Sequence, residues 1–460
     1  MKPPPHSAPA GETSSRADRP RLFRTLDGQN VAVTFALVSS LFLLWGFCNG
    51  MIDVMDKHFQ KELHLTLAQS AWVQFAHYLG YFLMALPAGW LATRLGYKGG
   101  IIAGLLMVAA GGLWFIPATH IAQFWAFLLG VCLIAAGLTF LETIANPYTT
   151  VLGAPQYAAT RINLAQSCNG IGWIFGPIAG GLFFYGKDGG GGSTGSQTLW
   201  IPYAGVAVVV LLLLIVFAFA KVPDIQTPDV YRGDDEGASL SIWRHPHFVG
   251  AVIAQFFYVA AQAGIFSFFI NYMTTETPPI PASWQTGPLA AWFESGAAGR
   301  LALTDQGAAY LASVGFICFL AGRFSGSLLL GLFPAHRVLG LYGLLNTAAC
   351  LVVMLKLGWF SVAGVFLSYF LMSIMFPTIF ALGIHGLGVR AKKASGFIVM
   401  AIMGGAVLPK LMGALGDRHG VSFSFLMPLV CFAIVAAYGF CWRKLSHDDH
   451  APVVAAAPGH

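Results

Sequence analysis

The sequence predicts an all-α integral membrane protein with twelve transmembrane helices, arranged as two six-helix halves in a pseudo-two-fold parallel repeat. Three observations support this fold class. Hydrophobic residues make up 57% of the 460 residues and charged residues only 10%, whereas soluble domains carry about 25% charged residues. Apolar runs of about 18 residues or more recur along the chain, and each could cross the hydrocarbon layer as a helix. Features of the first half also return in the second half.

The apolar runs define the predicted spans and domain boundaries. The twelve spans cover residues 31–57, 68–92, 99–118, 121–146, 162–185, 199–220, 248–273, 306–332, 336–357, 359–385, 394–415 and 421–442. The longest polar stretch on the predicted cytoplasmic side separates the sixth span from the seventh. The predicted domains are a disordered cytoplasmic tail (1–30), an N-terminal six-helix half (31–220), a cytoplasmic linker (221–247), a C-terminal six-helix half (248–443) and a second cytoplasmic tail (444–460).

Basic residues predict the orientation in the membrane. With a cytoplasmic N-terminus, 18 of the 25 Lys and Arg residues fall on the cytoplasmic side. This bias agrees with the positive-inside rule and places both termini in the cytoplasm. The first thirty residues lack an apolar core, so we do not expect a cleaved signal peptide. The net charge of +6 therefore reflects topology, and we expect no nucleic-acid partner.

The first span carries three polar or aromatic residues on one helical face. Trp45, Asn49 and Asp53 are spaced four apart, which places them one turn from each other on the same side of a helix. A carboxylate within a span is costly in hydrocarbon, so it usually faces the bundle interior or a water-filled cavity. The alternative is that Asp53, followed by Asp56 and Lys57, ends the span at the membrane surface.

The fourth span contains a second acid, Glu142, inside an apolar run with no basic residue beside it. Desolvation disfavours the charged form of a buried carboxyl group. Such a group can take up and release a proton during transport, so Glu142 is the candidate proton-coupling residue. The alternative is a permanently neutral acid that is hydrogen-bonded inside the bundle.

Amides and a histidine extend the candidate site. His77 lies in the second span, where an isolated histidine is more often a satisfied interior residue than a ligand. Gln166 and Asn169 share a face of the fifth span. They could line a cavity or join neighbouring helices, since polar side chains also hold transmembrane helices together.

The C-terminal half offers fewer charged groups within its spans. Gln255, Tyr258 and Gln262 form a polar stripe on the seventh span, and Gln262 is the candidate binding residue among them. In the tenth span, Phe376 precedes the helix-breaking Pro377.

Proline, glycine and basic residues reveal an internal repeat. Four residues of the first half recur at offsets of about 230 residues: Pro147, Gly153, Arg161 and Pro177 correspond to Pro377, Gly383, Lys392 and Pro409. The fourth span thus matches the tenth, and the fifth matches the eleventh. Parallel six-helix repeats are typical of transporters that bind their substrate near the midplane, between the two halves.

Motifs for other functions are absent from the sequence. No HExxH, phosphate-binding GxxxxGK[ST] or nucleophile with a credible base appears on any span. A G-x-S-x-G match at residues 191–195 lies in a low-complexity run without the strand-turn-helix context of a nucleophile elbow. The seven cysteines lie inside predicted spans without a CxxC pair, so we expect neither a metal site nor disulfides. The sequence therefore predicts that the protein is not an enzyme.

Several motifs together resemble one transporter family. These are WGF-x-NG-x-x-D-V-x-x-KHFQ, YFLMALPAGWLATRLGYK, LETIANPY-x-x-VLG, NLAQSCNGIGWIFGP, FPTIFALGIHGLG and KKASGFIVMAIMGGAVLP. They resemble the L-fucose:proton symporter family of the major facilitator superfamily, which includes bacterial glucose/galactose transporters. The resemblance covers residues 31–443. In the signature loop, Thr93 replaces the usual acid.

The resemblance implies roles for individual residues. It assigns sugar recognition and gating to Asp53 and proton transfer to Glu142. It also implies that four positions help to form the sugar site: Trp45, Asn49, Gln166 and Asn169. Phe376 stands where the resemblance leads us to expect a tyrosine, so one hydroxyl of the family site is missing, which weakens the case for fucose itself.

The sequence thus predicts proton-coupled symport of a monosaccharide, L-fucose or a related hexose such as glucose or galactose, into the cell by alternating access. A hexose presents hydroxyls for amides and carboxylates and an apolar ring face for an aromatic such as Trp45. We expect a monomer in the bacterial inner membrane, surrounded by lipid, without a cofactor. The alternatives are sodium coupling, a drug:proton antiporter with a more apolar site, and a sensing receptor that does not transport.

Overall fold

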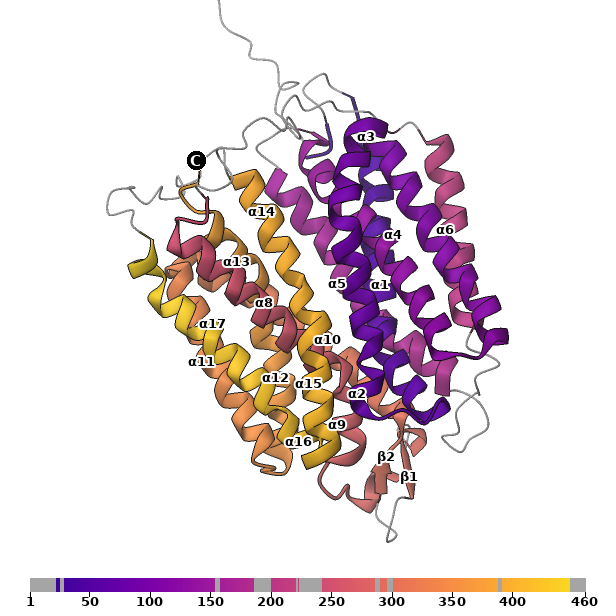
Figure 1. Ribbon diagram of the computed structural model, residues 1–460, viewed down its shortest axis with the longest axis vertical. Helices are drawn as coiled ribbons and strands as arrows, with labels where there is room; N and C mark the ends of the chain where they lie inside the picture. The colour runs from indigo at the N-terminus through magenta and orange to yellow at the C-terminus, as the bar shows by residue number, and fades with distance from the viewer. Residues whose placement is uncertain are drawn as a thin grey trace, which may run out of the picture.

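The computed structural model describes residues 22–24, 29–153, 158–185, 200–220, 222, 242–285, 290–295, 301–387 and 391–446. In this part of the chain, two groups of long helices lie side by side (Figure 1). The N-terminal half is drawn in indigo to magenta and the C-terminal half in red to yellow. Most of the predicted tails and of the predicted linker, and the whole G-x-S-x-G run, lie outside the described residues. The predicted domain boundaries stay a prediction.

The N-terminal half contains six spans. Its helices are α1 (Ala32–Glu62), α2 (Leu67–Ser70), α3 (Trp72–Ile121), α4 (Phe124–Val151), α5 (Ala158–Tyr185) and α6 (Trp200–Phe219). The long α3 joins the second and third predicted spans through Gly96, whose φ of 69° and ψ of 178° are not helical. Glycine adopts a positive φ without the steric penalty of a Cβ atom, so the chain turns back at this position.

The C-terminal half contains six further spans, several of which are interrupted. Its helices are α8 (Pro246–Ser267), α9 (Phe269–Thr275), α10 (Asp305–Leu332), α11 (Ala335–Met354), α12 (Trp359–Met372), α13 (Met375–Ile384), α14 (Ala391–Met400), α15 (Gly404–His419), α16 (Val421–Ser424) and α17 (Leu426–Leu445). A short 3-10 helix, η7 (Ala401–Met403), links α14 to α15. The tenth span is broken at Ser373 and Ile374, between α12 and α13.

The twelve predicted spans are confirmed. Ten stretches of the described chain are long and apolar enough to cross a membrane. The other two are the first part of α3 and the 28-residue α5, which carry the glutamine, histidine and asparagine side chains of the candidate site. These polar residues lower the hydropathy of helices that still pack inside the bundle.

The segment between α9 and α10 is partly structured. It contains the 3-10 helices η3 (Ala282–Gln285) and η4 (Ala290–Trp292) and a two-stranded antiparallel sheet of β1 (Phe293–Ser295) and β2 (Leu301–Leu303). The sheet lies at the end of the bundle that also holds α2, α9 and α16 (Figure 1). We call this end the sheet end, and the opposite end, where α1 begins and α17 ends, the terminal end.

Small residues bring α1 and α5 into close contact. A Cβ atom added to Gly46 would lie 2.0 Å from the carbonyl oxygen of Asn169. One added to Gly172 would lie 2.3 Å from the carbonyl oxygen of Leu43. Larger side chains would push these helices apart, so this glycine contact fixes the position of α1.

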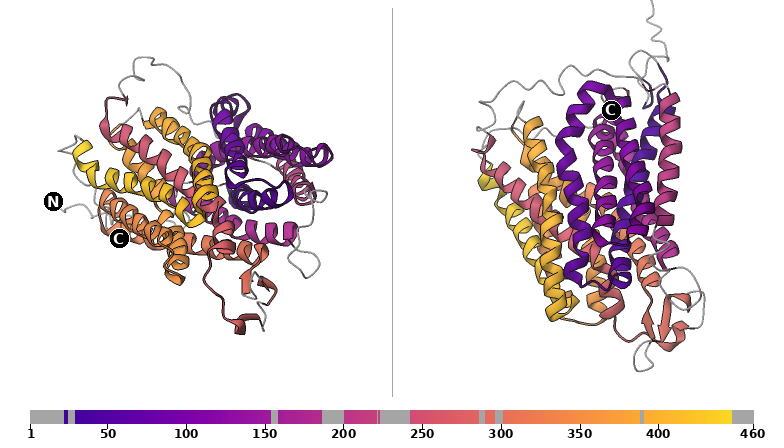
Figure 2. Two further views of the ribbon diagram at one scale, coloured as in Figure 1. Left: turned by 60° about the horizontal axis from the view of Figure 1, so that its bottom comes forward. Right: turned by 45° about the vertical axis from the view of Figure 1, so that its right-hand side comes forward.

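The two halves meet along α5 and α10, and where α15 packs against α2 and α3. A view from the sheet end shows the two groups of helices side by side (Figure 2). The candidate residues of both halves therefore lie on helices that adjoin this interface.

Candidate functional site

Asp53 is the central acid of the site. It is only 8% exposed on α1, and its Oδ1 accepts a hydrogen bond of 2.9 Å from Gln74 Nε2 on α3. Its Oδ2 is buried and has no hydrogen-bond partner in the described part of the chain. The carboxyl group is therefore deep in the bundle and does not end the span at the membrane surface. One of its oxygens is left for a ligand.

The other two residues on this face of α1 lie beside Tyr81. The indole Nε1 of Trp45 donates a hydrogen bond of 2.6 Å to Tyr81 Oη, and Asn49 lies next to the same hydroxyl. Asn49 is buried, and its Oδ1 has no partner among the described residues. The predicted face of α1 thus presents an aromatic ring, an amide oxygen and a carboxylate oxygen one turn apart.

His77 lies one turn from Gln74 on α3. Its ring packs against those of Tyr78 and Tyr81, with centroid distances of 5.1 and 4.9 Å. The imidazole is buried, and its Nδ1 has no partner in the described chain. The structure thus brings His77 to the cluster of Trp45, Asn49 and Asp53.

Glu142 is half-buried on α4. Its carboxyl group forms no hydrogen bond or ion pair with another described residue, so the alternative of a hydrogen-bonded structural acid has no partner to support it. The hydroxyls of Tyr78 and Tyr81 lie within electrostatic range of Glu142, and that of Tyr78 also lies within range of Asp53. Tyr78 is therefore close to both Asp53 and Glu142.

The two amides of α5 contact neighbouring helices. Gln166 Nε2 donates to Asn146 Oδ1 on α4 at 2.9 Å, one turn after Glu142. Asn169 Nδ2 donates to the carbonyl oxygen of Phe42 on α1 at 3.3 Å. Both side chains join helices in this conformation, which is one of the two roles that the sequence allows for them.

The C-terminal half contributes uncharged groups and one cation. Gln262 is half-buried on α8 without a hydrogen bond to another described residue. Tyr258 Oη donates to the carbonyl oxygen of Met372 at 3.0 Å, and its ring contacts Phe376 at 6.3 Å. Arg323 of α10 donates from Nε to the carbonyl oxygen of Ser373 at 3.5 Å. The tyrosine and the arginine thereby satisfy carbonyls at the break between α12 and α13.

Sequence reasoning missed Tyr369. This residue is fully buried on α12, its Oη has no partner in the described chain, and it lies within electrostatic range of Asp53 in the other half. Its ring packs on Phe266 at 4.6 Å and on Phe316 at 5.3 Å. Tyr369 lies in a largely apolar run in which its nearest polar neighbours are serines, so no pattern distinguishes it from a packed core tyrosine. Gln74 is a polar residue within a predicted span, and this alone could have marked it as a candidate site residue.

Aromatic rings connect the halves beside Tyr369. Trp173 of α5 packs on Phe316 of α10 at 4.8 Å and on Phe266 of α8 at 5.8 Å. These rings fill the interface between the two halves, and Tyr369 extends the cluster toward Asp53.

Polar contacts then close the interface at the sheet end. Each joins a residue of the N-terminal half to one of the C-terminal half, and together we call them the sheet-end contacts. Lys57 donates to Asn271 Oδ1 at 2.6 Å, Ser267 donates to Asp56, and Lys61 pairs with Asp305. Asp417 accepts hydrogen bonds from the backbone N–H groups of Leu67 at 2.8 Å and Ala68 at 3.0 Å. The site is therefore sealed from the sheet end in this conformation.

Comparison with known proteins identifies the family. Residues 33–409 match the model of the Major Facilitator Superfamily. The chain belongs to this superfamily. It is therefore a membrane transporter and not an enzyme, as the sequence predicts.

Curated members of the superfamily align over nearly the whole chain. A glucose/galactose transporter of Brucella abortus (strain 2308) is 32% identical over 433 residues, which cover 94% of this chain and 99% of the relative. An L-fucose-proton symporter of Escherichia coli (strain K12) is 34% identical over 423 residues, covering 88% of this chain and 91% of the relative.

Solved structures of the superfamily share the fold. The crystal structure of a Major Facilitator Superfamily transporter, FucP, in the outward conformation is 33% identical, with a TM-score of 0.65 over 90% of this chain and 99% of that one. A bacterial homologue of the lysosomal transporter Spinster has a TM-score of 0.69 over 92% of this chain and all of that one at 16% identity. The second match supports the superfamily fold alone.

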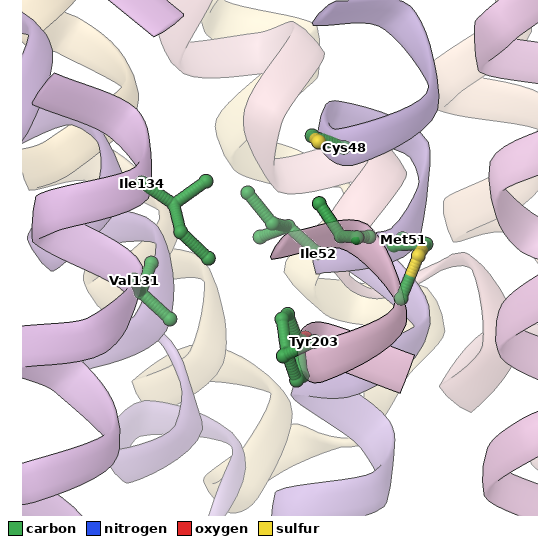
Figure 3. Close-up of a pocket in the computed structure, with 7 residues that line it drawn as sticks. Cys48, Met51, Ile52, Val131, Ile134 and Tyr203 are labelled. Carbon is green, nitrogen blue, oxygen red and sulfur yellow. The ribbon is translucent and has the colours of Figure 1, made fainter. Parts of the chain in front are cut away.

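A small apolar cavity lies apart from this site. It is enclosed by α1, α4 and α6 inside the N-terminal half (Figure 3) and has a volume of about 10 Å³, about the size of one water molecule. Its walls are Cys48, Met51, Ile52, Val131, Ile134, Tyr203 and Val206. A cavity this small and apolar is a packing gap within the superfamily fold and not the transport site.

Proposed function

We propose that this transporter carries a monosaccharide into the cell together with a proton. The observation that carries the proposal is a pair of buried groups on opposite halves that have no hydrogen-bond partner among the described residues: Asp53 Oδ2 and Tyr369 Oη. An unsatisfied buried polar group costs about 1–3 kcal/mol. A sugar hydroxyl donates and accepts at once, so one hydroxyl between the halves would satisfy both groups.

The rest of the site suits a pyranose ring. Asn49 Oδ1, one turn from Asp53 on α1, and His77 Nδ1 on α3 are further buried atoms without a hydrogen-bond partner in the described chain. The indole of Trp45 is held in place by Tyr81 and can pack against the apolar face of the ring. These groups support a small polyhydroxylated substrate better than a large apolar drug.

L-fucose and related hexoses such as glucose and galactose are the proposed substrates. Curated relatives at similar identity carry both names. Phe376 supplies an aromatic wall but no hydroxyl at its position, so this part of the site would contact a sugar through its apolar edge. The missing hydroxyl weakens the case for fucose itself.

We propose Glu142 as the proton carrier. The half-buried carboxyl lies near two phenols and has no cation beside it, an environment that favours its neutral form. A sodium ion would need several oxygen ligands around it. Binding of a proton at Glu142 and of sugar at Asp53, Asn169 and Gln262 would together favour rocking of one half against the other.

The sheet end is proposed to face the outside, and the terminal end the cytoplasm of a bacterial cell, because the basic residues gather at the terminal end. The sheet-end contacts would then hold the transporter closed to the outside. They must break before sugar and proton enter, and re-form as both are released inward. We further propose that a monomer performs this cycle, since each step uses residues of one chain.

The test is uptake of radiolabelled L-fucose, D-glucose and D-galactose into proteoliposomes, with and without an inward proton gradient. Wild type should accumulate at least one of these sugars against its gradient. Glu142→Gln keeps the size of the side chain but cannot lose a proton, so it should lose gradient-driven accumulation and still exchange sugar down its gradient. Glu294→Gln, which removes an exposed acid on β1, is the matched control. Gradient-driven accumulation by Glu142→Gln would exclude Glu142 as the proton carrier, and sodium dependence would replace proton coupling.

A further inference from the structure

An open groove lies at the terminal end of the C-terminal half, where α11 begins beside the end of α17. Five side chains line it: His336, Arg337, Leu341, Phe440 and Arg443. Its volume is about 440 Å³. The two helices touch closely beneath the groove, since a Cβ atom on Gly439 would lie 2.5 Å from the backbone nitrogen of Gly340. The floor of the groove is therefore well defined by backbone contacts.

The rim of the groove is basic. Arg337 and Arg443 are exposed, and both act electrostatically on the imidazole of His336 between them. Neither guanidinium forms a hydrogen bond or ion pair with another residue in the described part of the chain. Two arginines thus line one groove without an anionic partner among the described residues.

The wall below the rim is apolar and rigid. Leu341 and Phe440 are each about half exposed on helices that cross the membrane. Beside them, the Trp442 ring stacks on His336 at 5.4 Å, and its Nε1 donates to the carbonyl oxygen of Leu382 at 3.1 Å. This contact fixes the position of the imidazole.

The position of the groove matches the depth of lipid headgroups. Arg337 lies in the first turn of α11, and Arg443 lies in the last turn of α17. Basic side chains at the ends of spans reach the headgroup layer, while apolar side chains one turn deeper meet acyl chains. Basic pockets between transmembrane helices on the cytoplasmic side are suited to anionic lipid headgroups.

We propose that this groove binds one anionic phospholipid of the leaflet at the terminal end. The phosphate lies between Arg337 and Arg443, and one acyl chain packs on Leu341 and Phe440. The lipid would thereby join the start of α11 to the end of α17. This site is separate from Asp53 and Glu142, so the inference holds whatever substrate the transporter carries.

Lipid retention tests the proposal directly. The purified full-length protein is loaded with phosphatidylglycerol, or with phosphatidylcholine of the same acyl chains, then washed in detergent and examined by native mass spectrometry. Wild type should retain one phosphatidylglycerol per chain and little phosphatidylcholine. Arg337→Gln/Arg443→Gln should retain at least about tenfold less phosphatidylglycerol, because each basic residue contributes separately to the attraction.

Matched variants separate this site from general surface charge. Arg94→Gln/Arg244→Gln removes two exposed arginines at the terminal end outside the groove and should retain the lipid as wild type does. Arg337→Lys/Arg443→Lys keeps the charge and should show intermediate retention, since lysine cannot bind phosphate in the same forked geometry. Retention by this lysine variant would also show that changing both arginines does not by itself unfold the protein.

Other results would overturn the proposal. Equal retention by wild type and the double glutamine variant would exclude the groove as the binding site. Displacement of the lipid by millimolar inorganic phosphate would show a site for a free anion and not for a phospholipid. Equal retention of phosphatidylcholine and phosphatidylglycerol by wild type would show that the arginines do not select an anionic headgroup.

Discussion

The two halves share one fold but differ in the chemistry that they bring to the candidate site. The N-terminal half contributes two acids, Asp53 and Glu142, whereas the C-terminal half contributes Gln262, Tyr369 and Phe376. At the repeat offset that relates Pro147 to Pro377, Glu142 corresponds to Met372. The repeat has therefore kept the helix arrangement without the charge. We infer that one half performs coupling and substrate recognition, while the other mainly completes the walls of the site.

The backbone differs along with the chemistry. In the N-terminal half, α4 runs unbroken to Val151. The corresponding span is interrupted between α12 and α13, and Tyr258 and Arg323 bind the carbonyls of Met372 and Ser373 at the break. In the C-terminal half, the polar side chains of Tyr258 and Arg323 bind backbone carbonyls at the break. In the N-terminal half, the hydroxyls of Tyr78 and Tyr81 instead lie near the carboxyl group of Glu142 on α4.

The comparison predicts that Asp53→Asn has the largest effect of the following substitutions. It removes the charge but keeps the shape and one acceptor, so the protein should fold. Sugar affinity should fall by about 100-fold, because a hydrogen bond to a charged group contributes up to about 3 kcal/mol. Isothermal titration calorimetry would measure this, with Glu276→Gln, an ion-pair acid at the sheet end, as the control. Unchanged affinity would show that recognition does not depend on the acid of the N-terminal half.

A second prediction concerns the residue that orients this acid. Gln74→Ala removes the donor to Asp53 Oδ1 and should raise the KM for uptake by about tenfold, since an unpaired buried acceptor costs about 1–3 kcal/mol. The ratio of protons to sugars should stay the same, because Glu142 is untouched. A changed ratio would assign Gln74 to coupling and not to positioning. Gln69→Ala, which alters the start of α2 away from Asp53, is the control.

A third prediction concerns the closed sheet end. Asp417→Asn weakens the acceptor for the backbone N–H groups of Leu67 and Ala68 and should shift the population toward the open state by about fivefold, or about 1 kcal/mol. Electron–electron distance measurements between spin labels at Glu62→Cys and Glu276→Cys would report the opening. An unaltered distance distribution would show that the other sheet-end contacts suffice. Asp417→Glu, which keeps the charge, is the control.

The smallest effect is expected in the C-terminal half. Gln262→Ala should raise KM by about threefold, because the side chain is half-buried without a hydrogen bond to a described residue and its loss leaves no buried group unpaired. Uptake kinetics in proteoliposomes would measure it. An effect as large as that of Asp53→Asn would contradict the proposed division of roles between the halves.

The fold was largely predictable from the sequence, because spans depend on length and hydropathy, which are local properties. The gap between the predicted spans 68–92 and 99–118 marks the turn at Gly96, whereas hydropathy does not mark the break at Ser373 inside the predicted span 359–385. The face of α1 was also predictable, since helical spacing alone places Trp45, Asn49 and Asp53 together.

The rest of the site depends on how helices pack. Gln74 and Tyr369 reach Asp53 from other helices, and no spacing within one helix reveals such contacts. The link from Asp417 to the start of α2 joins residues about 350 positions apart. A charge inside an apolar span and the family resemblance both mark Asp53 and Glu142 as candidates, but neither shows which atoms lack partners among the described residues.

The helix α1 carries both the site and part of the seal. Asp53 lies one turn before Asp56 and Lys57, which contact Ser267 and Asn271 of the other half. At 1.5 Å per residue, this 31-residue helix is about 46 Å long, and its glycine contacts with α5 hold it as a stiff rod. Sugar binding at Asp53 should therefore move the end of α1 at the protein surface. A fluorophore attached near Glu62 would act as an optical sensor of sugar binding, without any label inside the site.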